Sequence, residues 1–182
     1  NLNLIDDSKR PNKDDLQKII LGTDIIYIGG GNVTYLMKVL SKTGVDKLLR
    51  QAYDKGIIMA GNSAGGCVWF DYYGNDEDDD FDGTFETFSP KKALGFVHGY
   101  FEPHWDTKTE KGIAKDSVSK NAVQRMLIKN NISGYGVDEG AALMIQTDGD
   151  KQTITEIISK NGAKIYKLTE QRQKYINLEK NR

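Results

Sequence analysis

Apolar and polar positions follow two different periods along the chain, and their alternation predicts the order of the elements. The continuous apolar run at 24–28 is typical of a strand buried on both faces of a parallel sheet, and a second such run lies at 57–60. Residues 34–40 and 45–55 instead carry apolar side chains at helical spacing. Strands that alternate with helices in this way indicate an α/β fold with a mainly parallel sheet and helices on both faces.

The remaining elements are shorter and follow the same rules. Acidic residues open the segment 13–21, and Gly22 follows it, which predicts a short helix. An Asp-Gly pair at 148–149 predicts a hairpin turn. Further strands are expected at 2–5, 94–101, 133–137, 141–146, 153–158 and 163–168, and further helices from 67 onward and at 117–130. We expect a single domain over residues 1–182.

Two segments depart from this pattern because they are strongly polar. Residues 71–90 are predicted to form a surface insertion, almost wholly acidic from 75 to 82, and residues 171–182 to form a polar tail. The triplet Asp78, Asp80 and Asp82 matches the start of a calcium loop. Ser89 stands at the twelfth position, where such a loop needs a glutamate, so we interpret the insertion as a solvated acidic loop.

Composition excludes several classes of protein. The 182 residues carry 25 basic and 26 acidic side chains, which gives no electrostatic case for binding nucleic acid or a membrane surface. A single cysteine, Cys67, excludes an internal disulfide and fits a reducing compartment. No apolar stretch approaches the roughly 18 residues of a membrane span, and no signal peptide leads the chain. We therefore expect a soluble cytoplasmic protein, a monomer or homodimer, without metal or cofactor.

The chain is organised around residues 61–66, which read Gly-Asn-Ser-Ala-Gly-Gly. A strand is predicted before this stretch and a helix after it, which is the setting of a nucleophile elbow. Glycines flank Ser63 because the turn needs strained backbone angles and a close approach of neighbouring chain. The simpler interpretation is a glycine-rich turn between a strand and a helix, with an incidental serine.

A serine nucleophile needs a base and a group that orients the base. His104 follows an apolar run and a proline, and Glu139 follows the predicted strand at 133–137. Both therefore lie, like Ser63, just past strand ends, where ligands bind in open α/β sheets. His98, the only other histidine, lies within a strand segment, and we expect it to be structural.

The same edge of the sheet also offers donors for an oxyanion. Residues 29–31 are three glycines after a buried strand, and Gly30 and Gly31 are the candidates there. The amide of Ala64, the residue after the serine, is the other candidate. A phosphate-binding turn is the alternative for residues 29–32, but the spacings of the known phosphate motifs are missing.

Four blocks together resemble the peptidase E family of serine peptidases. They are Ile-Gly-Gly-Gly-Asn-Val-Thr-Tyr-Leu at 28–36, Gly-Asn-Ser-Ala-Gly-Gly at 61–66, Glu-Pro-His-Trp at 102–105 and Gly-Val-Asp-Glu-Gly-Ala-Ala-Leu at 136–143. That family includes aspartyl dipeptidases and is related to the cyanophycinases. The resemblance implies a fold like the class I glutamine amidotransferase domain. It also implies a triad of Ser63, His104 and Glu139, with Asp138 as the alternative third member.

The resemblance carries further expectations about function. It implies a serine exopeptidase or dipeptidase that acts on small peptides through an acyl-enzyme, with Asp-X specificity as a family expectation. Asn32, Asn62 and Arg125 are candidates for binding substrate. Family members normally carry an extra N-terminal β–α–β unit before the segment that corresponds to residue 1 of this sequence. Without that unit, one edge of the sheet is expected to be bare.

Two other functions remain open from the sequence. A catalytically silent binding or scaffold domain would keep the fold without the chemistry. A glutamine amidotransferase is disfavoured because Ser63 stands where that chemistry needs a cysteine, and Cys67 is expected in the core.

Overall fold

The computed structural model describes residues 2–75, 87–107, 119–149, 151–169 and 174–175. Its helices are α1 (Lys13–Leu21), α2 (Val33–Thr43), α3 (Val45–Asp54), α4 (Ala64–Cys67), α5 (Lys120–Asn130) and the 3-10 turn η1 (Trp105–Thr107). Its strands are β1 (Ile25–Ile28), β2 (Ile58–Gly61), β3 (Phe70–Gly74), β4 (Pro90–Lys92), β5 (Val97–Glu102), β6 (Gly134–Val137), β7 (Ala141–Asp148), β8 (Lys151–Ser159), β9 (Ile165–Leu168) and β10 (Lys174–Tyr175). The α/β class predicted from the sequence is confirmed.

The N-terminal segment folds differently from its prediction up to the first helix. Residues 2–5 form no strand, because the side-chain oxygen of Asn3 accepts hydrogen bonds from the amides of Ile5 and Asp6, both at 3.1 Å. Such a local side-chain bond offers the backbone a turn in place of a ladder. The predicted helix is present as α1, and Asn12 caps it by accepting from the amide of Asp15.

Strands β1 and β2 form a two-stranded parallel sheet in which Ile25 pairs with Ile58. Helices α1, α2 and α3 contribute to one core cluster, and the β1 side chains of Ile26 and Ile28 pack against that cluster. The other face of β1 and β2 exposes Ile25, Tyr27 and Ile58. The prediction that the strand at 24–28 is buried on both faces is therefore wrong for the described structure.

The second sheet has six strands in the order β10-β9-β6-β5-β3-β4. Its central strands β3, β5 and β6 run parallel, and antiparallel strands flank them on both sides. The sequence prediction is wrong at two places here. The helix after Ser63 ends at Cys67, and both ends of the predicted insertion at 71–90 are strands, because buried Phe70 and Tyr73 anchor β3 in the sheet. The calcium-like motif at 78–83 lies outside the described residues, which resume at 87. Ser89 is described, and its backbone amide donates to the side-chain oxygen of Asn75 at 2.7 Å.

Helices cover both faces of this sheet, as predicted. Phe70, Val97 and Phe101 belong to the core that α2, α3 and α4 share, whereas Tyr100 and Leu168 belong to the core under α5. The apolar side chains of α5 that face the sheet are fully buried, and they are Ala122, Val123, Met126 and Leu127. Helix α4 contacts strands of both sheets, so the stretch after Ser63 joins the two halves of the fold.

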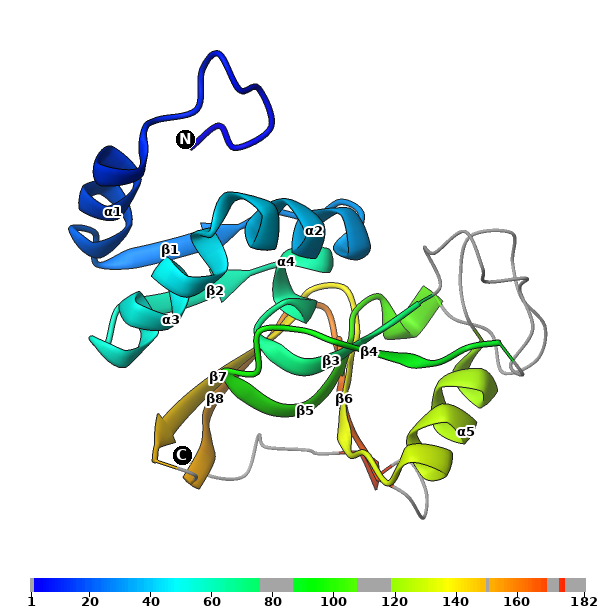
Figure 1. The fold of residues 1–182 in the computed structure, drawn as a ribbon. Helices are drawn as coiled ribbons and strands as arrows, with labels where there is room; N and C mark the ends of the chain where they lie inside the picture. The colour runs from blue at the N-terminus through cyan, green and yellow to red at the C-terminus, as the bar shows by residue number, and fades with distance from the viewer. Residues whose placement is uncertain (1, 76–86, 108–118, 150, 170–173, 176–182) are drawn as a thin grey trace.

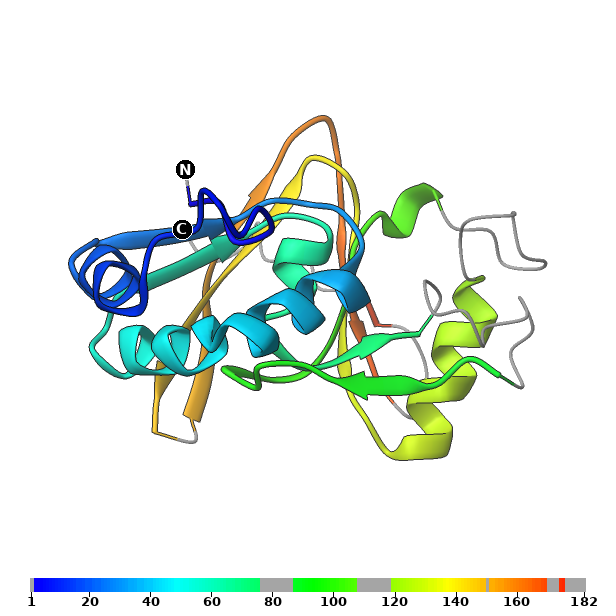
Figure 2. The ribbon, with the colours of Figure 1, turned by 45° about the horizontal axis from the view of Figure 1, so that its top comes forward.

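A long hairpin completes the fold. Strands β7 and β8 pair antiparallel around Gly149, which has a positive φ of 56°. The hairpin extends from the six-stranded sheet on the side opposite α5 (Figures 1 and 2). Part of the predicted polar tail, Lys174–Tyr175, pairs with β9. No helix among the described residues is long and apolar enough to cross a membrane.

Candidate active site

Ser63 lies in the sharp turn between β2, which ends at Gly61, and α4, which begins at Ala64. Its backbone angles are φ 50° and ψ −127°, a conformation that L-residues seldom adopt. Strain of this kind is expected at a nucleophile elbow, where it turns the serine side chain out of the sheet. The predicted strand–turn–helix setting is present.

The glycines around Ser63 are required by close backbone packing. A Cβ on Gly65 would lie 2.6 Å from the carbonyl oxygen of Gly29 and closer still to that of Ile28. A Cβ on Gly61 would overlap the carbonyl oxygen of Gly65. The serine turn and the glycine turn after β1 therefore touch backbone to backbone, which no side chain would permit.

His104 follows β5 and Pro103 and carries the second unusual backbone conformation of the site, with φ 55°. Its Nε2 lies 2.9 Å from the Oγ of Ser63. The next residue, Trp105, is completely buried, and a Cβ on Gly136 of β6 would lie 2.6 Å from its ring. Packing of Trp105 on β6 thus fixes the turn that presents His104 to the serine.

Glu139 follows β6 and places its Oε1 3.0 Å from Nδ1 of His104. The neighbouring Asp138 is buried and instead accepts a hydrogen bond from the amide of Lys164 at 2.8 Å. Burial raises the pKa of the Asp138 carboxyl above its usual value. Of the two carboxylates considered, Glu139 is the one that contacts the imidazole.

The glycine turn lies directly beside the serine. A Cβ on Gly30 would be 3.2 Å from the Cβ of Ser63, and Gly31 has a φ of 145°. Within the part of the chain that the structure describes, the amides of Gly30, Gly31 and Ala64 donate no hydrogen bond. All three predicted oxyanion donors therefore have their N–H groups available next to the serine turn.

The three residues predicted to bind substrate have different surroundings. Asn32 caps α2 by accepting from the amide of Tyr35 at 2.6 Å. Asn62, next to the serine, accepts from the hydroxyl of Tyr27 at 2.6 Å. Arg125 is exposed on α5 and takes no part in the hydrogen bonds that join Ser63, His104 and Glu139.

Two residues of the site escaped the sequence analysis. Tyr27 lies on the exposed face of β1 and orients the Asn62 amide from there. Asp106, two positions after His104, accepts a hydrogen bond from the backbone amide of Glu139 at 2.9 Å. The signal for Asp106 is its place directly after the histidine block, but its partner is 33 positions away and no sequence period links them.

The other candidate side chains lie apart from the Ser63–His104–Glu139 contacts. His98 projects from β5, is largely exposed and lies 3.4 Å from a carboxylate oxygen of Asp71. Cys67 is buried in the core, where its thiol lies 3.6 Å from the carbonyl oxygen of Phe101. The burial of Cys67 confirms its prediction, whereas the structural role of His98 stays a prediction.

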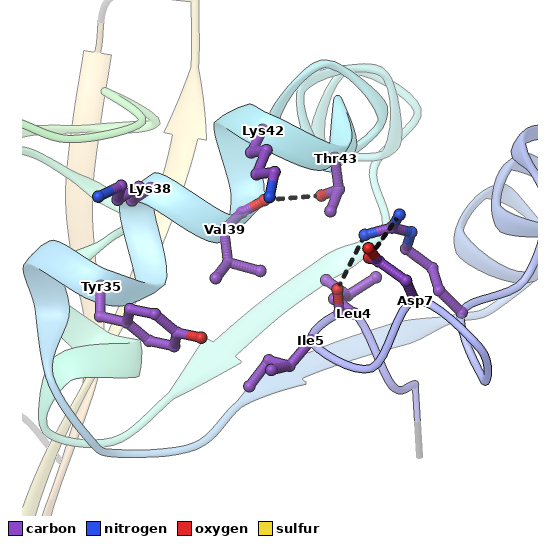
Figure 3. Close-up of a pocket in the computed structure, with 9 residues that line it drawn as sticks. Leu4, Ile5, Asp7, Tyr35, Lys38, Val39, Lys42 and Thr43 are labelled. Carbon is purple, nitrogen blue, oxygen red and sulfur yellow. Dashed lines mark hydrogen bonds and ion pairs between the residues drawn. The ribbon is translucent and has the colours of Figure 1, made fainter.

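A pocket of about 130 Å³ lies between the N-terminal segment and α2 (Figure 3). Leu4, Ile5, Tyr35 and Val39 line it together with the exposed Lys42. Ser63, His104 and Glu139 do not line this pocket, so it is separate from the serine turn. Among the described residues, no group of three His, Cys, Asp or Glu side chains gathers as a metal site.

Solved structures of other proteins share the fold. A peptidase from an acI-B1 actinobacterium is similar with a TM-score of 0.64 and 17% identity, over 91% of this chain and 62% of that one. A candidate peptidase E protein from Listeria monocytogenes EGD-e is similar with a TM-score of 0.56 and 20% identity, over 80% of this chain and 66% of that one. At these identities the likeness concerns the fold alone.

Sequence comparison identifies the family. The chain is 33% identical over 162 residues to YgaJ of Bacillus subtilis strain 168, a peptidase described as uncharacterized, which covers 87% of this chain. The chain spans about 62% of the length of YgaJ. The model of peptidase family S51 matches residues 1–155. This match agrees with the resemblance carried by the four sequence blocks, and the chain belongs to peptidase family S51.

Proposed function

We propose that the chain is a serine exopeptidase or dipeptidase in which Ser63 is the nucleophile, His104 the general base and acid, and Glu139 the orienting carboxylate. The observation that carries the proposal is the continuous chain of contacts Ser63–His104–Glu139, at 2.9 and 3.0 Å, starting from a serine with strained backbone angles. Both distances lie within the reach that a nucleophile, its base and the orienting group require. Family membership supports the coarser statement that the chain is a peptidase.

Each side chain has a defined task in this mechanism. His104 takes the proton from the Ser63 hydroxyl as the oxygen attacks the carbonyl carbon of the peptide bond. The amides of Gly30 or Gly31 and of Ala64 stabilise the resulting oxyanion. His104 then gives the proton to the leaving amine, and the C–N bond breaks to leave an acyl-enzyme. Water, deprotonated by His104, hydrolyses the ester and restores the serine.

Glu139 accepts the Nδ1 proton of His104, which leaves Nε2 as the acceptor that faces Ser63. The carboxylate also stabilises the imidazolium formed after proton transfer. The side chains of His104 and Glu139 are 46% and 61% exposed. A peptide can therefore approach this side of the triad from solvent.

Asn62 is the residue best placed to bind substrate in this proposal. The Tyr27 hydroxyl donates to its side-chain oxygen, so the amide nitrogen is left to donate to a substrate carbonyl or carboxylate. That nitrogen lies 3.6 Å from where a Cβ on Gly30 would be, beside the proposed oxyanion donors. Specificity for N-terminal aspartate remains a family expectation. A cytoplasmic location is also part of the proposal, because a single cysteine in these 182 residues fits a reducing compartment.

The direct test is hydrolysis of a panel of dipeptides that begins with Asp-X and includes Ala-X. We expect turnover by the unchanged chain and a loss of about 1000-fold or more in Ser63→Ala and in His104→Ala. Glu139→Gln should keep the fold and lose activity strongly. Glutamine no longer selects the imidazole tautomer with its proton on Nδ1, so Nε2 is not held ready to accept the Ser63 proton.

His98→Ala is the matched control, since it removes the other histidine of the same strand segment without touching the triad. It should retain the activity of the unchanged chain. Equal activity in the folded unchanged chain and in Ser63→Ala would refute the proposed nucleophile. A folded chain that hydrolyses none of the peptides and does not react at Ser63 would favour the silent binding domain.

A further inference from the structure

We propose that Asp106 is a positioning residue that sets the distance between His104 and Glu139. This inference rests on the proposed function and adds a residue to the machinery of the same site. The carboxylate of Asp106 accepts the backbone N–H of Glu139 at 2.9 Å. The proposed orienting carboxylate is therefore attached, through its own amide, to the turn that carries the proposed base.

The need for such a contact follows from the origin of the two side chains. His104 and Glu139 are 35 positions apart and come from different loops, one after β5 and one after β6. Glu139 is exposed and lies in a turn before Gly140, which has a φ of 86°. Apolar packing therefore does little to hold the Glu139 side chain, and a hydrogen bond from its own backbone supplies the missing restraint.

The histidine turn is itself well anchored, so Asp106 connects an exposed residue to an anchored turn. Trp105 is buried against Gly136, and the Thr107 hydroxyl donates to the carbonyl oxygen of His104 at 2.8 Å. Asp106 lies between these two residues and is exposed itself. Its carboxylate makes a charge-assisted bond to an amide, the stronger type of hydrogen bond.

The experiment compares the rate at which a fluorophosphonate probe modifies the full chain carrying Asp106→Ala or Asp106→Asn with the rate for the unchanged chain. Alanine removes the acceptor, and a shift of about 1 Å in a reacting group can reduce rates about 100-fold, so we expect a loss of about 10- to 100-fold. Asparagine keeps an acceptor oxygen, so Asp106→Asn should recover the rate to within about threefold of the unchanged chain.

Asp71→Ala is the matched control for a merely structural effect. Asp71 also accepts a backbone amide, that of Gly99 at 2.9 Å, but at the opposite end of β5 from His104. We expect Asp71→Ala to lower the melting temperature and to leave the labelling rate unchanged. A rate loss in Asp106→Ala together with recovery in Asp106→Asn and an unchanged rate in Asp71→Ala would support the proposal.

Three results would overturn it. The first is that the probe modifies Asp106→Ala as fast as the unchanged chain. The second is that the modification rate of Asp71→Ala falls as far as that of Asp106→Ala. If Asp106→Ala does not fold, a labelling rate of folded Asp106→Asn as low as that of His104→Ala would overturn it. Failure of the unchanged chain to label at all is a different result, because it refutes the proposed function itself.

Discussion

Gly65→Ala is predicted to reduce activity because its side chain would clash with backbone atoms beside Ser63. A Cβ at this position would lie 2.5 Å from the carbonyl carbon of Ile28 and 2.6 Å from the carbonyl oxygen of Gly29. Real Cβ contacts essentially never fall below 3.0 Å, and the carbonyl oxygen of Ile28 would lie closer still than these two atoms. All three atoms are backbone, so the backbone at one of the two turns must move by about 1 Å. Overpacking of this kind costs about 1–3 kcal/mol of folding free energy.

The displacement also changes the proposed chemistry. Gly30 of the glycine turn lies against Ser63 of the other turn, so movement of either turn shifts the proposed oxyanion donors relative to the proposed nucleophile. We expect peptide hydrolysis to fall about 100-fold. The assay pairs kinetics with urea unfolding of the same sample, so that loss of activity is measured on folded protein.

Gly29→Ala is the matched control for stability. A Cβ there meets no atom within 4 Å, and its φ is not positive, so the same substitution in the same turn should leave the free energy of unfolding unchanged. If Gly65→Ala proved as stable and as active as the unchanged chain, the close contact between the two turns would be refuted.

Three further predictions concern stability. Arg50→Met should lower the free energy of unfolding by about 1–2 kcal/mol in urea titrations with activity retained, since Arg50 donates to two carbonyl oxygens and stacks over Phe96. Tyr53→Phe should lower it by about 1 kcal/mol, because the Tyr53 hydroxyl donates to Thr147 of the hairpin. Burial raises the pKa of the Asp138 carboxyl, so its protonated form stabilises the fold at low pH, and this stability is lost as pH rises from 3.8 through the raised folded pKa. Asp138→Asn should therefore be more stable than the unchanged chain at pH 7. Equal melting temperatures of the two proteins at pH 7 would contradict this prediction.

The site was more predictable from the sequence than the sheet around it. Gly61, Gly65 and Gly66 surround Ser63 for reasons of local sterics, and such reasons are visible in a six-residue stretch. His104 and Glu139 were predicted to meet Ser63 because all three follow strands, and strand ends share one edge of a parallel sheet. The contacts at 2.9 and 3.0 Å agree with that expectation.

The errors in the predicted elements have physical causes that the period of apolar and polar residues does not reveal. The polar residues between Asp71 and Pro90 suggested an insertion throughout, yet Phe70 and Tyr73 are buried and hold β3 beside β5. Residues 2–5 alternate like a strand, but Asn3 bonds the local backbone instead. Apolar side chains at 25 and 27 indicated burial on both faces, whereas the helices pack on one face of β1 and leave Ile25 and Tyr27 exposed.

The central claim is that Ser63 is a nucleophile activated by His104, and intact-protein mass after incubation with a fluorophosphonate tests it most directly. We predict one adduct on the unchanged chain and none on Ser63→Ala or His104→Ala under the same conditions. An unmodified mass for the folded, unchanged chain would contradict the claim. So would an adduct that persists in Ser63→Ala, because the reactive group would then be another residue.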